Sequence, residues 1–163
     1  FQSPGPLLYF QKRSGWKNKP FTIIKFRTMH ADHGSDQKQV TLGDQRLYGF
    51  GAWLRQISLD EVPQFWNTLK GDMSIVGPRP HMLEHDTLFA KVMKSYHVRT
   101  YVRPGITGLA QVRGFRGEAS SEEAIIKRVL NDIEYIEHWT ILLDLFLVLK
   151  TARQVIIPPK SAI

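Results

Sequence analysis

The sequence predicts a mixed α/β (α+β) domain that is compact and mainly helical, with one small antiparallel β-hairpin. Segments 7–12 and 21–29 are rich in aliphatic and aromatic residues and flank a turn that contains glycine and proline. Most of the chain after residue 45 carries apolar residues at helical spacing. With 163 residues the chain is long enough to bury one hydrophobic core, so one domain over residues 1–163 is expected.

The composition points to an anionic partner. The net charge is +7 and the isoelectric point is near 9.8, which suits nucleic acid, a phosphorylated substrate or acidic lipid. The chain contains no cysteine, so disulfides and thiolate metal sites are excluded. It begins at Phe1, with neither a signal peptide nor an apolar run of 18 residues, and is therefore expected to be a piece of a longer chain.

The middle of the chain is expected to form a loop and two helices. Residues 30–45 are polar and contain glycine, which is typical of a loop, and residues 46–56 favour a short helix. The next helix is predicted to begin at Ser58, where Glu61 stands three residues later as in a capping box. Gly71 follows the last apolar residue and predicts where this helix ends.

The second half of the chain is predicted to be helical at both ends. Residues 82–97 favour an amphipathic helix, and residues 99–117 are turn-rich and basic. Ser120 and Glu123 form a second capping-box pattern, which predicts a helix that ends near residue 138.

An apolar helix is predicted over residues 140–157, before two prolines. Its nine-residue apolar core is interrupted by Asp144. This core is too short to cross a bilayer, and it suits a buried or interfacial helix.

The adjacent carboxylates Asp60 and Glu61 are the main candidates for chemistry. Acidic residues in the first turn of a helix favour its dipole, and Glu61 would complete the capping box, which is a purely structural role. Alternatively, one carboxylate could attack phosphorus while its neighbour holds a divalent cation. The local pattern leaves both interpretations open.

Arg79 is the strongest basic candidate because it lies between two prolines. A guanidinium held in a rigid turn suits a bidentate grip on phosphate, although a solvated surface turn explains the same pattern. Asp132 is a single helical acid, a type that is usually solvated. His81 and His85 lack the glutamate of a zinc-binding helix and are expected at the surface. Weaker basic candidates for binding phosphate are Lys25, Arg27, Arg55, Arg103, Arg113 and Arg116.

Four phrases, taken in order, resemble the bacterial sugar transferase family, the monotopic polyprenyl-phosphate phosphoglycosyl transferases. The phrases are KPFTIIKFRTM (19–29), LRQISLDEVPQ (54–64), LKGDMSIVGPRP (69–80) and VRPGITGLAQV (102–112). The resemblance runs from about Gly5 to Ile157, which is almost the whole chain.

The resemblance implies a transferase that moves a sugar-1-phosphate from a UDP-sugar to undecaprenyl phosphate and releases UMP. It implies that Asp60 is the nucleophile and that Glu61, beside it, coordinates or positions Mg²⁺. Arg79 would grip a phosphate. Lys25, Arg55 and Asp132 match further polar positions of the family's site. Both substrates are anionic, so cations are needed beside an anionic nucleophile.

The resemblance also implies a place and a pathway. The family normally has an N-terminal hydrophobic segment that enters the membrane, and this chain is expected to lie on the cytoplasmic face of the bacterial inner membrane. The phrase VRGFRGE (112–118) resembles longer members that use glucose- or galactose-1-phosphate to start exopolysaccharide, capsule or lipopolysaccharide O-antigen synthesis. An N-acetylhexosamine donor is the alternative. A homo-oligomer is possible.

A non-enzymatic basic module is the competing class of function. The net charge supports binding to acidic lipid or nucleic acid. Aromatic residues are not interleaved with base-reading side chains as in a single-strand binder, so no nucleic-acid partner is expected.

Overall fold

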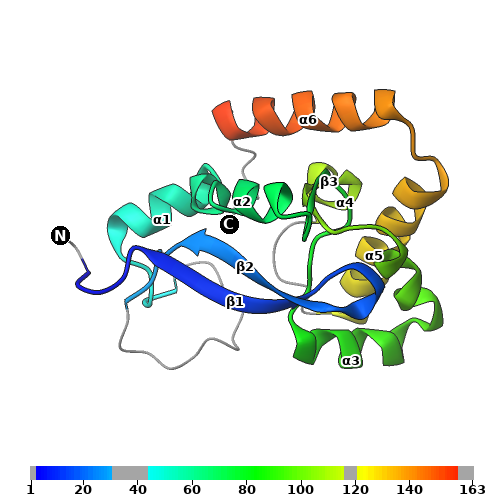
Figure 1. The fold of residues 1–163 in the computed structure, drawn as a ribbon, viewed down its shortest axis with the longest axis horizontal. Coiled ribbons are helices and arrows are strands. Elements are labelled where there is room, and N and C mark those ends of the chain that lie inside the picture. Colours follow the sequence, from blue (N-terminus) through cyan, green and yellow to red (C-terminus); the bar gives the residue numbers. More distant parts are fainter. Residues whose placement is uncertain (1–2, 31–43, 116–120, 158–163) are drawn as a thin grey trace.

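The computed structural model describes residues 3–30, 44–115 and 121–157, and Figure 1 shows their arrangement. Strands β1 (Leu8–Ser14) and β2 (Pro20–Phe26) form an antiparallel hairpin. Their register pairs Leu8 with Phe26 and Ser14 with Pro20. The predicted hairpin and the predicted α+β class are confirmed.

Three helical segments follow the hairpin. Helix α1 (Gly49–Gln56) confirms the short helix predicted over residues 46–56. A short 3-10 turn η2 (Leu59–Glu61) and helix α2 (Gln64–Leu69) replace the single helix predicted to begin at Ser58. The predicted capping box is wrong, because Ser58 adopts a left-handed conformation (φ 61°) and its side chain caps nothing. A left-handed residue turns the chain sharply, so η2 starts in a new direction and Asp60 and Glu61 are buried.

A second, two-stranded sheet is parallel and was not predicted. It pairs β3 (Ser74–Val76) with β4 (Gly105–Thr107), and helix α4 (Leu109–Val112) follows β4 directly. Backbones approach closely here: a Cβ atom built on Gly105 would lie 2.1 Å from the backbone nitrogen of Gly77. The contact joins the segment that carries Arg79 to the segment over residues 99–117 that was predicted to be turn-rich and basic.

The predicted helix over residues 82–97 is broken. Helix α3 (Leu83–Val92) ends before Met93, which is extended, and a run of 3-10 turns, η3 (Lys94–Tyr101), continues the chain. Helix α5 (Glu122–Glu137) follows the predicted range, but its cap is Ser121, whose side chain accepts a hydrogen bond from Ala124. The predicted cap, Ser120, lies outside the described residues.

Helix α6 (Ile141–Ile156) confirms the predicted apolar helix and is capped by Thr140. Asp144, which interrupts its apolar run, accepts hydrogen bonds from Tyr135 (2.8 Å) and Trp139 (3.1 Å). Within the described ranges, no helix is both long and apolar enough to cross a membrane.

Two clusters form the core, and α5 contributes to both. The members of the first cluster are Val76, Leu109, Val112, Tyr135 and Leu147. The members of the second cluster are Phe89, Tyr96, Ile125 and Val129. Because Tyr135 and Val129 lie on the same helix, α5 ties the parallel sheet and α6 to α3 and η3.

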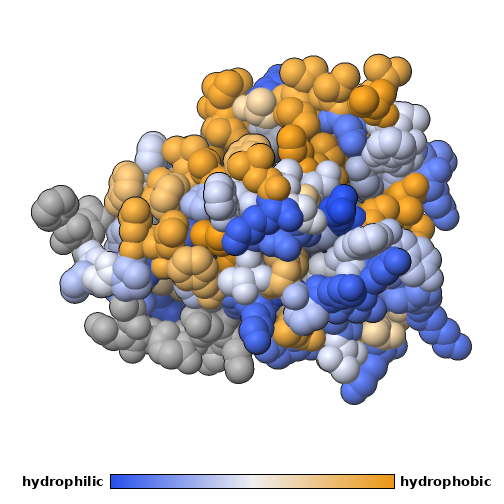
Figure 2. Space-filling view, in the orientation of Figure 1, coloured by the Kyte–Doolittle hydropathy of each residue, from blue (hydrophilic) through white to orange (hydrophobic). Residues whose placement is uncertain are grey.

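Large apolar side chains are exposed on α1, η2, α2 and α6. Figure 2 shows hydrophobic residues gathered toward the edge that α6 and α1 occupy in Figure 1. We call the following residues the apolar face: Phe50, Trp53, Val62, Phe65, Trp66, Leu69, Ile141, Leu142, Leu145, Phe146 and Leu149.

Candidate active site

The site is assembled by attaching α2 to the hairpin. The buried side chain of Asn67 on α2 accepts a hydrogen bond from the backbone nitrogen of Ile24 (3.1 Å) and donates one to the carbonyl of Thr22 (2.7 Å). Both partners lie on β2, so this one amide fixes β2 against the segment that carries Asp60 and Glu61.

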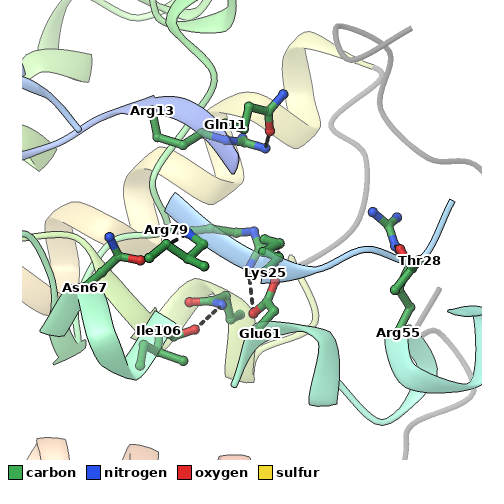
Figure 3. Close-up of polar contacts among 11 residues, drawn as sticks. Gln11, Arg13, Lys25, Thr28, Arg55, Glu61, Asn67, Arg79 and Ile106 are labelled. Atoms are coloured by element: carbon green, nitrogen blue, oxygen red, sulfur yellow. Dashed lines mark hydrogen bonds and ion pairs between the residues drawn. The ribbon is translucent and has the colours of Figure 1, made fainter. Parts of the chain in front are cut away.

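Glu61 is the centre of an ion-pair cluster. Its Oε1 atom lies 2.8 Å from the Nζ of Lys25 on β2 and 2.8 Å from a terminal nitrogen of Arg79. Figure 3 shows these two cations reaching Glu61. Burial acts to lower the pKa of Arg79, but the adjacent Glu61 raises that pKa above its usual value. The three side chains predicted from distant parts of the sequence therefore meet.

Asp60 is buried, with 5% of its surface exposed, and lies beside this cluster. Burial raises the pKa of Asp60, and the negative charge of Glu61 acts in the same direction. The positive charges of Lys25, Arg55 and Arg79 oppose that rise. Among the described residues none donates a hydrogen bond to the Asp60 carboxylate, so cations rather than donors stabilise its charge.

Arg55 belongs to the same site. Its Nε atom donates a hydrogen bond to the hydroxyl of Thr28 (2.8 Å), at the end of the hairpin. Helix α1 reaches Thr28 because Gly51 has no side chain: a Cβ atom there would lie 2.2 Å from the carbonyl oxygen of Thr28. This contact holds Arg55 close enough to Asp60 for its positive charge to oppose the rise in the pKa of that carboxyl.

Asp132 is linked to the site through Arg99. It is buried and accepts two hydrogen bonds from Arg99, at 3.0 Å and 2.8 Å. Arg99 also donates to the carbonyl oxygen of Arg79 (2.6 Å). Burial raises the pKa of Asp132, and Arg99 opposes that rise. The expectation that Asp132 is solvated is wrong. Hydrogen bonds connect Asp132 through Arg99 to the turn that carries Arg79.

Three predicted basic candidates have other surroundings or lie outside the structure. Arg103 lies over the ring of Trp16, 5.4 Å from its centroid. Arg113 forms an exposed ion pair with Glu134 (2.5 Å), not with the buried carboxylates. Arg116 lies outside the described residues.

Arg27, another weak candidate, serves the N-terminal segment. It donates hydrogen bonds to Ser3, to the carbonyl of Pro6 (2.6 Å) and to the carbonyl of Met29 (3.0 Å). These contacts anchor the start of the chain to the hairpin.

Four further residues near the site were missed by sequence reasoning: Arg13, His81, Arg99 and Arg128. His81 was expected at the surface, but it is 4% exposed and contacts Tyr96 and Arg99. Arg99 and Arg128 are equally buried. A single arginine or histidine in a sequence carries no signal of burial, which depends on packing among distant segments.

The two carboxylates were also tested as a magnesium site. The described residues contain no group of three or more acidic, histidine or cysteine side chains that could hold a metal. Mg²⁺ is, however, commonly held by one or two carboxylates together with substrate phosphates. Two adjacent acids fit that arrangement, provided that phosphate oxygens and water supply the remaining ligands.

Two buried carboxylates and three basic side chains thus lie together in this part of the fold. The sequence profile of the family described as bacterial sugar transferase matches residues 1–158. The chain therefore belongs to the bacterial sugar transferase family.

Curated relatives carry more specific names. A UDP-glucose:undecaprenyl-phosphate glucose-1-phosphate transferase from Xanthomonas campestris is 47% identical over 94% of this chain and 32% of that protein. A protein of the same name from Caulobacter vibrioides is 47% identical over 92% of this chain and 57% of that protein. A UDP-N-acetylgalactosamine-undecaprenyl-phosphate N-acetylgalactosaminephosphotransferase from Aeromonas hydrophila is 39% identical over 95% of this chain and 36% of that protein. The chain thus spans between about a third and somewhat more than half of these relatives.

Proposed function

We propose that this chain is the catalytic part of an enzyme that transfers a sugar-1-phosphate from a UDP-sugar to undecaprenyl phosphate. The observation that carries the proposal is the buried Asp60, beside Glu61 and within reach of the charges of Lys25, Arg55 and Arg79. Family membership and the names of the relatives support the reaction class.

The reaction proceeds in two displacements at one phosphorus atom. A carboxylate oxygen of Asp60 forms a bond to the phosphorus that carries the sugar, and the bond from that phosphorus to UMP breaks. UMP leaves with the electron pair. An oxygen of undecaprenyl phosphate then attacks the same phosphorus, the bond to Asp60 breaks, and the carboxylate is regenerated.

The chain's own cations make these steps possible. A negative nucleophile must approach a negative diphosphate, and preorganised positive groups offset that repulsion. The positive charges of Lys25, Arg55 and Arg79 oppose the rise in the pKa of Asp60 and so favour its carboxylate form. Asp60 and Glu61 would hold Mg²⁺, which supplies charge neutralisation for the leaving phosphate when it is bound.

The preferred donor is UDP-glucose. Relatives that are 47% identical are named for glucose-1-phosphate transfer, whereas the relative named for N-acetylgalactosamine is 39% identical. UDP-galactose and a UDP-N-acetylhexosamine remain the competing donors, and a panel of the three separates them by the rate of UMP release.

The enzyme works at the cytoplasmic face of the bacterial inner membrane. Undecaprenyl phosphate resides in the bilayer, and the apolar face on α1, α2 and α6 suits burial at a lipid interface. The net charge of +7 adds attraction to anionic headgroups.

Release of UMP by the intact enzyme, with Asp60→Asn as the variant, tests the proposal. Wild-type enzyme with Mg²⁺, UDP-glucose and undecaprenyl phosphate is expected to release UMP, and Asp60→Asn is expected to lose at least about a thousandfold of that rate, because an amide is not a competent nucleophile. Normal turnover by Asp60→Asn would refute the assignment of the nucleophile. Absence of UMP release by the wild type, together with salt-sensitive binding to acidic lipid, would favour a binding module.

A further inference from the structure

The turn that carries Arg79 depends on other segments for its shape. Residues 78–81 form neither a helix nor a strand, and the prolines on either side of Arg79 have no backbone N–H to donate. The carbonyl of Pro78 accepts a hydrogen bond from a backbone nitrogen of β4 (2.9 Å), and the carbonyl of His81 accepts one from a backbone nitrogen of β1 (3.1 Å). The two sheets thus hold the turn at both of its ends.

The carbonyl of Arg79 itself is held by a side chain. A terminal nitrogen of Arg99 donates a hydrogen bond to it (2.6 Å). The same guanidinium donates two hydrogen bonds to Asp132, one from Nε (3.0 Å) and one from that terminal nitrogen (2.8 Å). Asp132 lies on α5, so Arg99 joins the turn to the helix that contributes to both core clusters.

The other terminal nitrogen of Arg99 connects it to α3 and β1. This nitrogen donates to the hydroxyl of Tyr96 (3.2 Å), and that hydroxyl donates in turn to Asp86 on α3. Asp86 also accepts a hydrogen bond from Ser14 at the end of β1. All three guanidinium nitrogens of Arg99 are therefore engaged within the protein.

Arg99 and Asp132 are too deeply buried to reach a substrate. Arg99 is 5% exposed and Asp132 is 2% exposed. Burial acts to lower the pKa of Arg99, but the adjacent Asp132 raises that pKa above its usual value, so the pair is held as two opposite charges. By contrast, the side chain of Arg79 is 24% exposed and lies beside Glu61. Any effect of the buried pair on a bound phosphate must therefore pass through Arg79.

We propose that Arg99, supported by Asp132, is a positioning residue for the transferase reaction. It fixes the backbone of Arg79, so that the Arg79 guanidinium stays beside Glu61 while the substrate reacts. This inference rests on the proposed function, in which the charge of Arg79 stabilises the reacting phosphate. It gives Asp132 an indirect role, although the resemblance had matched Asp132 to a polar position of the family's site.

A double-mutant cycle of Arg99→Lys and Arg79→Met in the intact enzyme tests the proposal. Lysine keeps a positive charge beside Asp132, but it lacks the planar guanidinium that holds Asp132 and the Arg79 carbonyl together. Arg99→Lys alone is expected to lower kcat/KM for UDP-glucose, measured by UMP release, about tenfold or more. In the Arg79→Met background the same change should cost less than about twofold, because the residue through which Arg99 acts is gone.

Equal losses of kcat/KM in the two backgrounds would overturn the proposal. A merely structural role gives that result, because it lowers the Tm and the folded fraction whether or not Arg79 is present. The Tm of every variant is therefore measured, and activity is compared well below the lowest value. Should Arg99→Lys fail to fold, Asp132→Asn takes its place in the cycle, because asparagine has nearly the shape of aspartate.

Arg46→Lys is the matched control. It makes the same exchange in an ion pair with Asp44 (2.5 Å), ahead of α1, and should change kcat/KM less than about twofold in either background.

Hydrogen exchange of the turn does not depend on turnover. In the ligand-free enzyme, the peptide that contains Arg79 should exchange about tenfold faster in Arg99→Lys than in the wild type or in Arg46→Lys. Unchanged exchange would overturn the positioning role. Wild-type enzyme that released no UMP would instead refute the proposed function, so the two failures are distinct.

Discussion

Because Asp60 is buried, its ionised form costs folding free energy. The pKa of Asp60 is higher in the folded protein than in the unfolded chain, so the folded state binds the proton of this acid more tightly. Proton binding by Asp60 therefore stabilises the folded protein fully below the unfolded pKa of about 4, and this stabilisation is lost as the pH rises through the folded pKa. Residues held in this way for a reaction commonly trade stability for activity.

Asp60→Asn is accordingly expected to stabilise the protein while it abolishes turnover. Asparagine resembles the neutral acid, so the free energy of unfolding should rise by about 1 kcal/mol near neutral pH, and the gain should vanish below about pH 4. Thermal denaturation at the two pH values measures this difference. Glu137→Gln, which removes an exposed carboxylate from α5, is the control for the loss of a negative charge. A loss of stability in Asp60→Asn at neutral pH would contradict the account of its pKa.

Two acids on α5, two residues apart, should differ sharply in their contribution to stability. Asp132→Ala leaves Arg99 buried without its partner, and breaking a buried ion pair costs about 3–5 kcal/mol. Glu134→Ala removes the exposed partner of Arg113 and should cost about 0–1 kcal/mol. Urea denaturation of the two variants gives both values, and equal costs would argue against the role of Asp132 as the support of Arg99.

At the scale of elements, the active site depends on a close contact between β3 and β4. Gly105→Ala would place a methyl group 2.1 Å from the backbone nitrogen of Gly77, two residues before Arg79. The strands must separate, which is expected to cost about 1–3 kcal/mol and to lower activity by displacing Arg79. Gly71→Asn is the control, because that glycine has φ +82° and open surroundings, and asparagine tolerates this conformation. Wild-type stability of Gly105→Ala, in a denaturant titration, would contradict the contact.

Local pattern predicted the elements that are long and regularly spaced. The hairpin, α5 and α6 follow from runs of apolar residues and from their turns and caps. The strands β3 and β4 have three residues each, too few to display a period, and pair across about thirty residues of chain. The break at Met93 and the left-handed Ser58 were missed because tertiary contacts override local preference there.

The candidate site was predictable only in part. Asp60, Glu61 and Arg79 stand out in the sequence, and the structure brings Glu61 and Arg79 together as expected. Arg99 and Arg128 resemble ordinary surface arginines in the sequence, and it is packing that buries them. Their roles depend on which segments of the fold become neighbours, which spacing along the chain does not encode.

At the scale of the whole molecule, many of the large apolar side chains that this basic chain exposes gather on the apolar face. Leu142 and Leu149 on α6 are 73% and 71% exposed. Exposure of a contiguous apolar surface is typical of a protein that contacts a partner or a membrane.

The double variant Leu142→Ser/Leu149→Ser should lose affinity for membranes. Burial of a leucine at a lipid interface contributes about 1.5–3 kcal/mol, so binding of the 163-residue chain to vesicles that contain anionic lipid should fall at least about tenfold. Co-sedimentation measures the change. Leu88→Ser on α3 removes a leucine that is 55% exposed and distant from α6 in Figure 1, and it should bind as the wild type does. Equal losses of vesicle binding in both variants would contradict the prediction that the apolar face on α6 contacts the membrane.

The central claim, that Asp60 carries the sugar phosphate, is tested most directly by mass spectrometry of the intact enzyme mixed with UDP-glucose and Mg²⁺ in the absence of undecaprenyl phosphate. The account predicts a burst of UMP equal to the amount of enzyme, and a hexose phosphate adduct on the peptide that contains Asp60. Undecaprenyl phosphate should then remove the adduct. A burst of UMP with the adduct on a different residue, or turnover that requires both substrates and leaves no adduct at all, would contradict it.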